Sequence, residues 1–549
     1  MVDPGARPVV DPVARSVVDP GVTSMTGFPL DAAISRRRLF GLGAGVAAAV
    51  AGGAALDACG SPDTSAEVRR RHRDGILQVG LVAAPDDLNP LDSGSEITRW
   101  IADPVMESLY AWDDQLRSVP LLADGDPEIS PDGLTWTIRL KRGIRFHNGD
   151  ELGADDLVAT WSRMLDLSAG SEWITYMLGY VQRFSAVDDH TAQMVLAHPY
   201  GLLRSHLTNM PVSHRDYVDR RDTMMGTGPY RLAASVPGQS FTLSRFDGYH
   251  GRRPAFSAIQ FTVFADTTTR LVTLEQGKVD LITGLAYGDL AQARRSPGVA
   301  VQVAKAPMDV LTYVNLFTEP FSDRNFRKAV AYATDRRGVL DRVYGGQATI
   351  GQGPIGPAEL GYDAGLQVFP AAPDYATARS YLAKATTTRR TFTVTIGQER
   401  LIADICQVLA AGWAELGITV HLQPLAAGPW SNEWLSRKYE MLAETFQSGF
   451  TSGPANYLVL TPADETSILS CGYKNPDVTR LMATVWQTAD DQERVDALRR
   501  IDRIVADDAV MFPPVYPKLA IARRTELSAP DPRQLRISRL GLQNLHFVG

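Results

Sequence analysis

The sequence predicts an α/β fold with more than one domain, and three observations support this. The chain has 549 residues, whereas a single hydrophobic core rarely grows beyond about 250–300 residues. Segments with the two-residue period of strands alternate with segments that have the 3.6-residue period of helices. A strand, a helix and a second strand follow one another between residues 393 and 422, as in a parallel β-α-β unit.

Three elements are predicted in the N-terminal half of the body. Residues 76–81 are a short apolar run, which indicates a strand. Apolar and polar residues alternate over 134–140 after the turn sequence Pro131-Asp132-Gly133, which predicts a half-buried strand. Residues 154–164 carry apolar side chains at helical spacing, so we expect an amphipathic helix there.

The C-terminal half repeats this mixture of elements. Residues 393–396 and 418–422 are predicted strands, and 401–416 is a predicted helix with Gly417 placed to cap it. Residues 490–507 form a further amphipathic helix, with Val495, Leu498, Ile501 and Val505 on one face. The body therefore combines strands and helices along its whole length.

The N-terminal 58 residues are predicted to be a leader and signal peptide. Arg36 and Arg37 precede an uncharged stretch at 39–56, which resembles a twin-arginine export signal. The stretch ends in Leu56-Asp57-Ala58-Cys59, which resembles a bacterial lipobox, although Asp57 departs from the usual uncharged residue. We therefore expect lipidation at Cys59, because acyl chains there would hold the mature protein at a membrane.

The start of translation and the tether stay open. Val-Asp-Pro recurs at residues 2, 10 and 18, so translation from Met25 is an alternative to translation from Met1. Residues 59–75 form a polar tether that includes the basic run 69–73. That run is either a solvated linker or a contact with anionic lipid headgroups.

Composition and missing motifs exclude several classes of function. A formal net charge of −7 argues against a nucleic-acid-binding protein, which needs a basic face. No phosphate-binding Gly-rich loop, nucleophile elbow or metal-ligand spacing occurs, so we expect no enzyme, cofactor or metal. Of the three cysteines, Cys406 and Cys471 are compatible either with one bridge or with two buried thiols.

Several blocks occur together in a specific order and spacing. They cover residues 103–110, 120–123, 130–149, 154–158, 226–230, 275–280 and 326–336. In this order they resemble the family 5 extracellular solute-binding proteins, which are dipeptide- and oligopeptide-binding lipoproteins of ABC importers, here of the actinobacterial type. The resemblance covers about residues 76–512.

The resemblance implies a periplasmic-binding-protein-like fold of type II, cluster C, which has two lobes and an additional inserted domain. Lobe I would be discontinuous, the inserted domain II would follow its first segment, and lobe III would be the large C-terminal lobe. The predicted boundaries are 1–58 for the leader, 59–75 for the tether, 76–112 with 225–315 and 515–549 for lobe I, 113–224 for domain II, and 316–514 for lobe III. A ligand would be trapped when the lobes close about a hinge.

The resemblance also implies where the ligand binds. In peptide-binding members an acidic loop residue pairs with the peptide α-amino group, but the two matching positions here are Gly449 and Gly453. Glu444 is an alternative acid, and otherwise a neutral, blocked or larger ligand is favoured, such as a glycan fragment or a cell-wall peptide. The predicted ligand contacts are Phe446, Gln447, Ser448, Gly449, Asn456, Tyr457 and Trp430. His147 is predicted to be structural.

The predicted function is capture of a peptide or peptide-like solute and its delivery to a membrane permease. The expected partners are this ligand, ABC permease subunits and the membrane through the lipid anchor, with no nucleic acid, and we expect a monomer. The expected location is the outer face of the cell membrane. The alternative is a non-transport ligand-binding lipoprotein that regulates cell-envelope assembly.

Overall fold

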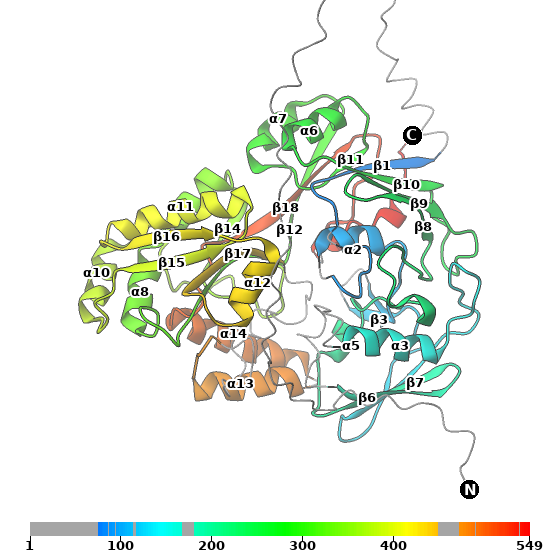
Figure 1. Cartoon of the computed structure of the whole chain (residues 1–549), viewed down its shortest axis with the longest axis horizontal. Helices are drawn as coiled ribbons and strands as arrows, with labels where there is room; N and C mark the ends of the chain where they lie inside the picture. The colour runs from blue at the N-terminus through cyan, green and yellow to red at the C-terminus, as the bar shows by residue number, and fades with distance from the viewer. Residues whose placement is uncertain are drawn as a thin grey trace, which may run out of the picture.

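The computed structural model describes residues 75–85, 87–93, 95–113, 117–166, 181–447, 471–488, 490–536 and 539–548. The leader, the tether, Arg36, Arg37 and Cys59 lie outside these residues. Three main sheets organise the described part of the chain, and helices pack around each of them (Figure 1). Among the described residues, no helix has the length and apolar character needed to cross a membrane.

The first sheet contains strands from both ends of the chain. Its order is β12-β18-β11-β1-β10-β9-β8, and β1 runs parallel to β10 and β11. The strands are β1 (Ile76–Leu81), β8 (Tyr230–Val236), β9 (Ser240–Arg245), β10 (Ala258–Val263), β11 (Leu281–Ile282), β12 (Val299–Lys305) and β18 (Val515–Arg524). The helices beside it are α2 (Glu96–Ala102), α6 (Thr267–Glu275), η3 (Tyr287–Asp289), α7 (Leu290–Arg295), α15 (Pro532–Arg536) and η6 (Leu542–Asn544).

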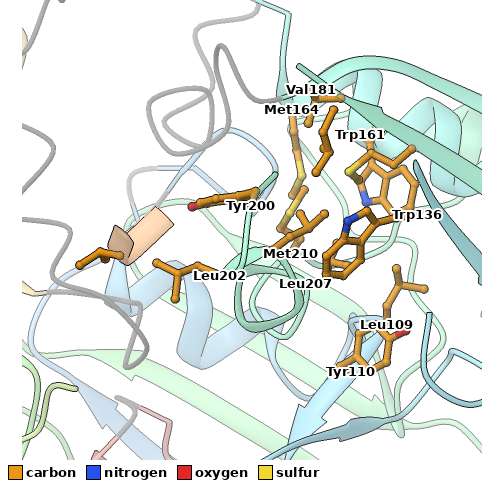
Figure 2. Close-up of a cluster of buried hydrophobic side chains, with 14 of the residues drawn as sticks. Leu109, Tyr110, Trp136, Trp161, Met164, Val181, Tyr200, Leu202, Leu207 and Met210 are labelled. Carbon is orange, nitrogen blue, oxygen red and sulfur yellow. The ribbon is translucent and has the colours of Figure 1, made fainter. Parts of the chain in front are cut away.

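The second sheet lies within residues 113–224. Its antiparallel order is β4-β5-β7-β6, and a hairpin of β2 and β3 lies outside it. The elements are β2 (Tyr110–Trp112), β3 (Ser118–Pro120), β4 (Glu128–Ile129), β5 (Thr135–Arg139), α3 (Ala154–Met164), β6 (Val181–Asp188), β7 (Thr191–Leu196), α5 (Leu203–His206) and η2 (Arg215–Tyr217). Buried aromatic and aliphatic side chains such as Trp136, Trp161 and Met210 fill its core (Figure 2).

The third sheet has the order β13-β17-β15-β16. Its strands are β13 (Met308–Val314), β15 (Thr391–Ile396), β16 (Thr419–Pro424) and β17 (Met441–Gln447), and the short strand β14 (Ala348–Ile350) pairs with β18 instead. The helices are α8 (Arg324–Tyr332), α9 (Arg336–Gly338), the π-helical η4 (Val339–Val343), α10 (Tyr375–Lys384), α11 (Arg400–Ala414), α12 (Ala427–Leu435), α13 (Pro476–Gln487) and α14 (Asp491–Asp507).

The predicted elements are confirmed with small shifts at their ends. The strand at 76–81 is β1 and the helix at 154–164 is α3. The β-α-β unit is β15, α11 and β16, and the two strands pair in parallel. The helix predicted at 490–507 is α14, which begins one residue later because the Asp490 side chain accepts hydrogen bonds from two N–H groups of the first turn.

The two cysteines of the body are buried and free, so the bridge that the sequence left open is absent. Cys406 lies on the inner face of α11, in the core between that helix and the third sheet. Burial raises the pKa of Cys406 to about 12 and the pKa of Cys471 to about 11. Both side chains therefore act as small apolar core residues.

The chain passes between the first and third sheets at two adjacent places. Strand β12 ends at Lys305, which pairs with Lys518 of β18, and β13 begins three residues later with a partner in the third sheet. The second passage runs from Met511, which bridges Tyr313 of β13, to Val515, where β18 begins to pair with β14 and then with β12. At both passages only a few residues link the last paired residue of one sheet to the first paired residue of the other.

Candidate ligand-binding site

The sheet topology indicates where a ligand binds. Strands β15 and β17 are parallel, and their carboxyl ends lie at Ile396 and Gln447. In the first sheet the parallel strands β1, β10 and β11 end at Leu81, Val263 and Ile282. Because ligands of open α/β sheets bind outside the carboxyl ends of the strands, these two edges are the candidate walls of the site.

An aromatic contact joins the two edges. Tyr287, which follows β11, places its ring 4.8 Å from the ring of Tyr344, which follows η4. The Tyr287 hydroxyl donates a hydrogen bond of 2.7 Å to the carbonyl oxygen of Lys518 at the crossing of β18. The pKa of each tyrosine is raised by burial, so both rings stay neutral. The carboxyl edge of the first sheet therefore meets the third sheet beside the crossing.

The structure places part of the predicted loop at the carboxyl end of β17. Phe446 and Gln447 are the last two residues of this strand, and their backbones pair with Asp309 and Met308. Ser448, Gly449, Gly453, Asn456 and Tyr457 lie outside the described residues. The predicted contacts made by these residues stay predictions.

Trp430 belongs to an aromatic cluster on α12. Its ring lies 5.7 Å from the ring of Trp434, which in turn stacks on Tyr313 of β13 at 6.0 Å. The indole nitrogens of both tryptophans are buried and have no hydrogen-bond partner among the described residues. Two N–H donors without acceptors among the described residues therefore lie beside β13, the strand that pairs with β17.

Glu444 is an acidic side chain at this edge that forms no ion pair among the described residues. Its carboxylate accepts a hydrogen bond of 3.0 Å from the Thr445 N–H, and no Lys or Arg of the described residues forms an ion pair with it. Burial and then the negative charge of Glu399 raise the pKa of Glu444 to about 7. A Cβ atom on Gly397, at the end of β15, would lie 2.6 Å from the Glu444 carboxylate.

Glu440, which lies just before the same strand, shows the contrast. Its carboxylate contacts the Arg389 guanidinium at 2.5 Å and accepts a hydrogen bond of 2.7 Å from the Thr393 N–H. A partly buried carboxylate is stabilised by such a cation, and Glu444 lacks one. Glu444 is therefore the described residue of the edge best suited to receive a cationic group.

His147 is held by structural contacts. Its Nε2 atom lies 3.0 Å from the carbonyl oxygen of Gly228, and its ring packs edge-on against Phe246 at 5.0 Å. Burial lowers the pKa of His147 to about 4, so the ring is neutral at physiological pH. These contacts agree with the structural role expected from the sequence.

Comparison with known proteins decides the family. Residues 117–466 match the model of the bacterial extracellular solute-binding proteins, family 5 Middle. The chain belongs to this family.

Curated relatives and solved structures from bacteria resemble the chain over most of their length. The Di/tripeptide-binding protein 2 of Pseudomonas aeruginosa is 22% identical over 488 residues, which cover 82% of this chain and 91% of that protein. DppA from Helicobacter pylori, solved in complex with the peptide STSA, superposes with a TM-score of 0.76 at 19% identity. AgaA from A. tumefaciens R10, solved in complex with agropinic acid, superposes with a TM-score of 0.75 at 20% identity.

These superpositions cover 86% of this chain, 98% of DppA and 99% of AgaA. The protein is therefore a family 5 solute-binding protein with the α/β fold of these relatives. DppA was solved with a peptide and AgaA with agropinic acid, so the fold itself does not fix one class of ligand.

Proposed function

We propose that this protein is the substrate-binding subunit of an ABC importer and takes up a peptide or peptide-like solute without altering it. The observation that carries the proposal is the pair of strand edges that meet beside a two-stranded crossing. A solute bound between these edges contacts both sheets, and it therefore favours the arrangement in which the sheets are close. Delivery to a permease follows when this arrangement opens.

The chemistry of the described wall supports a solute that carries a cationic group. Glu444 is a partly buried carboxylate without a basic partner, and an ammonium group placed there would compensate its charge. Trp430 and Trp434 add flat apolar faces and two indole donors for the rest of the solute. A peptide with a free amino terminus offers an ammonium group for Glu444 and carbonyl oxygens and side chains for the tryptophans. This supports peptide transport over the envelope-assembly alternative.

Native mass spectrometry of the purified protein tests this proposal, because a trapped solute adds a discrete mass. We expect a co-purified peptide-like molecule and a rise of the melting temperature when trialanine is added. N-acetyl-trialanine, which lacks the ammonium group, is expected to give a smaller rise. Equal rises of the melting temperature for both peptides would show that Glu444 does not recognise the ammonium group. The absence of any rise and of any trapped solute across a peptide panel would refute peptide capture.

Export and anchoring belong to the same proposal. Arg36 and Arg37 support export through the twin-arginine route, and Cys59 supports a lipid anchor that holds the protein on the outer face of the cell membrane. A monomer held there is in position to meet the permease subunits. We expect Cys59→Ala to move the protein from the membrane fraction to the soluble fraction, and a variant that stays membrane-bound would contradict lipidation at this residue.

A further inference from the structure

Segment 113–224 and the helices α13 and α14 belong to different sides of the molecule, as their contacts show. Segment 113–224 is tied to the first sheet's side of the molecule, because Arg163 forms an ion pair of 2.6 Å with Asp92 and Arg539 donates to the Thr208 carbonyl at 2.9 Å. Helix α14 is tied to the third sheet's side, because Asp507 contacts Lys328 of α8 at 2.9 Å. The chain itself passes between the first and third sheets at the β12–β13 connection and at the residues that lead from Met511 into β18.

These two sides also touch at a place that is separate from the crossings. The Gly201 N–H donates a hydrogen bond of 2.7 Å to the carbonyl oxygen of Trp486, near the end of α13. The Tyr200 ring lies 5.8 Å from the Trp486 ring. We call this the docking contact, and it consists of residues 200–201 against 486–488. In Figure 1, α13 and α14 lie below the third sheet, whereas β12 and β18 cross above.

The docking contact is shaped for a residue without a side chain. A Cβ atom on Gly201 would lie 2.1 Å from the Thr488 carbonyl oxygen and 2.7 Å from a guanidinium nitrogen of Arg494. Arg494 is buried and donates to the carbonyl oxygens of Val485 and Thr488, so it holds the α13–α14 turn in place. The Thr488 carbonyl is a backbone group, and the Arg494 guanidinium is held by backbone carbonyls. A larger residue at position 201 would therefore push the α13–α14 turn away.

Apolar burial continues across the same place. Tyr200 and Leu202 are 2% exposed and lie at the margin of the core of segment 113–224, away from Trp136 (Figure 2). The same buried cluster includes Val485 of α13 and Leu498 of α14. Separation of the two sides would expose part of this surface, so the contact favours the closed arrangement.

We propose that segment 113–224 fastens the closed form of the protein by docking Gly201 onto the α13–α14 turn. In the closed form the two sides of the molecule are then joined at two separate places, the crossing of β12 and β18 and the docking contact. A solute that draws the sheets together also brings these residues into contact, and the docking contact adds to the stability of the closed form. Segment 113–224 therefore takes part in closure although it contributes no strand to either of the facing edges.

Gly201→Ala tests this role, and Gly288→Ala is the matched control because a Cβ atom there would meet nothing within 4 Å. The readout is cross-linking by a short bismaleimide between His198→Cys, just outside the docking contact, and Gln487→Cys, an exposed position within it, in a Cys59→Ala background. We expect Gly201→Ala to lower the cross-linking rate about tenfold, the factor that corresponds to about 1.4 kcal/mol. Small-angle scattering should show a larger radius of gyration.

Trp486→Ala keeps Gly201 and removes the ring contact, so it decides the question if Gly201→Ala fails to fold. We expect it to lower the cross-linking rate and raise the radius of gyration, with a cooperative melting transition retained. Cross-linking rates and radii equal to those of Gly288→Ala in both variants would overturn the proposal. These measurements use the full chain after any co-purified solute has been removed, so their outcome is independent of whether peptides bind.

Discussion

Replacement of Glu444 by Gln should make the protein more stable at alkaline pH. Glutamine has the shape of a protonated glutamate, so the variant keeps the neutral form of the side chain at every pH. The pKa of Glu444 is raised from 4.5 to about 7 in the folded protein. A raised pKa means that the wild-type protein has its full stability below pH 4.5, loses stability as the pH rises toward 7 and then stays level.

The size of this effect follows from the shift. Each pKa unit corresponds to about 1.4 kcal/mol, so the complete shift would give about 3 kcal/mol. Because the side chain is partly exposed, solvent screens part of this energy, and we expect a gain of about 1–2 kcal/mol for Glu444→Gln at pH 8 and almost none at pH 4.

Urea unfolding at intervals between pH 4 and pH 8.5 measures this difference. Glu440→Gln is the matched control, because Glu440 has the Arg389 partner that Glu444 lacks and its replacement should lower stability at pH 8. A difference between Glu444→Gln and wild type that does not change with pH, or a variant that is less stable at pH 8, would show that the carboxylate is compensated in a way that the described contacts do not include.

Three further outcomes are expected. Trp413→Ala should lower the free energy of unfolding by about 3–5 kcal/mol in urea titrations, because the ring is buried and its N–H donates to the Val330 carbonyl at 3.0 Å. Arg163→Ala should cost about 3 kcal/mol, because it leaves the buried carboxylate of Asp92 without its 2.6 Å partner, whereas the exposed Arg117→Ala should change stability by less than about 1 kcal/mol. Dithiothreitol should leave the melting temperature unchanged, and a fall would indicate a disulfide bond.

The elements that local sequence determines could be predicted. The period-2 pattern around Trp136 and Ile138 identifies β5, and the apolar spacing after Gly153 identifies α3. The strand 515–524 could not be assigned its role in this way, because its pairing with both β12 and β14 depends on residues far away in the chain. Local patterns carry no information on which distant strand becomes a neighbour.

The site was predictable only in part for the same reason. Family resemblance placed Phe446 and Gln447 beside the ligand, and the structure puts them at the carboxyl end of β17. The contact of Tyr287 with Tyr344 had no signal in the sequence, because it joins two sheets. Glu444 and Glu440 are the same residue type, so the sequence does not distinguish them. Only the fold shows that the charge of Glu440 is paired with Arg389.

The place of β18 in the first sheet has a consequence for biosynthesis. This strand lies between β12 and β11, yet it is synthesised after every other strand of the described residues. The third sheet can assemble while the first sheet still lacks an internal strand, and the sheet that contains β1 is complete only after β18 has been synthesised. A premature stop before Val515 would therefore leave β12 without the strand that pairs with it, and the first sheet would be incomplete. Loss of the residues after 539 would leave every named strand in place.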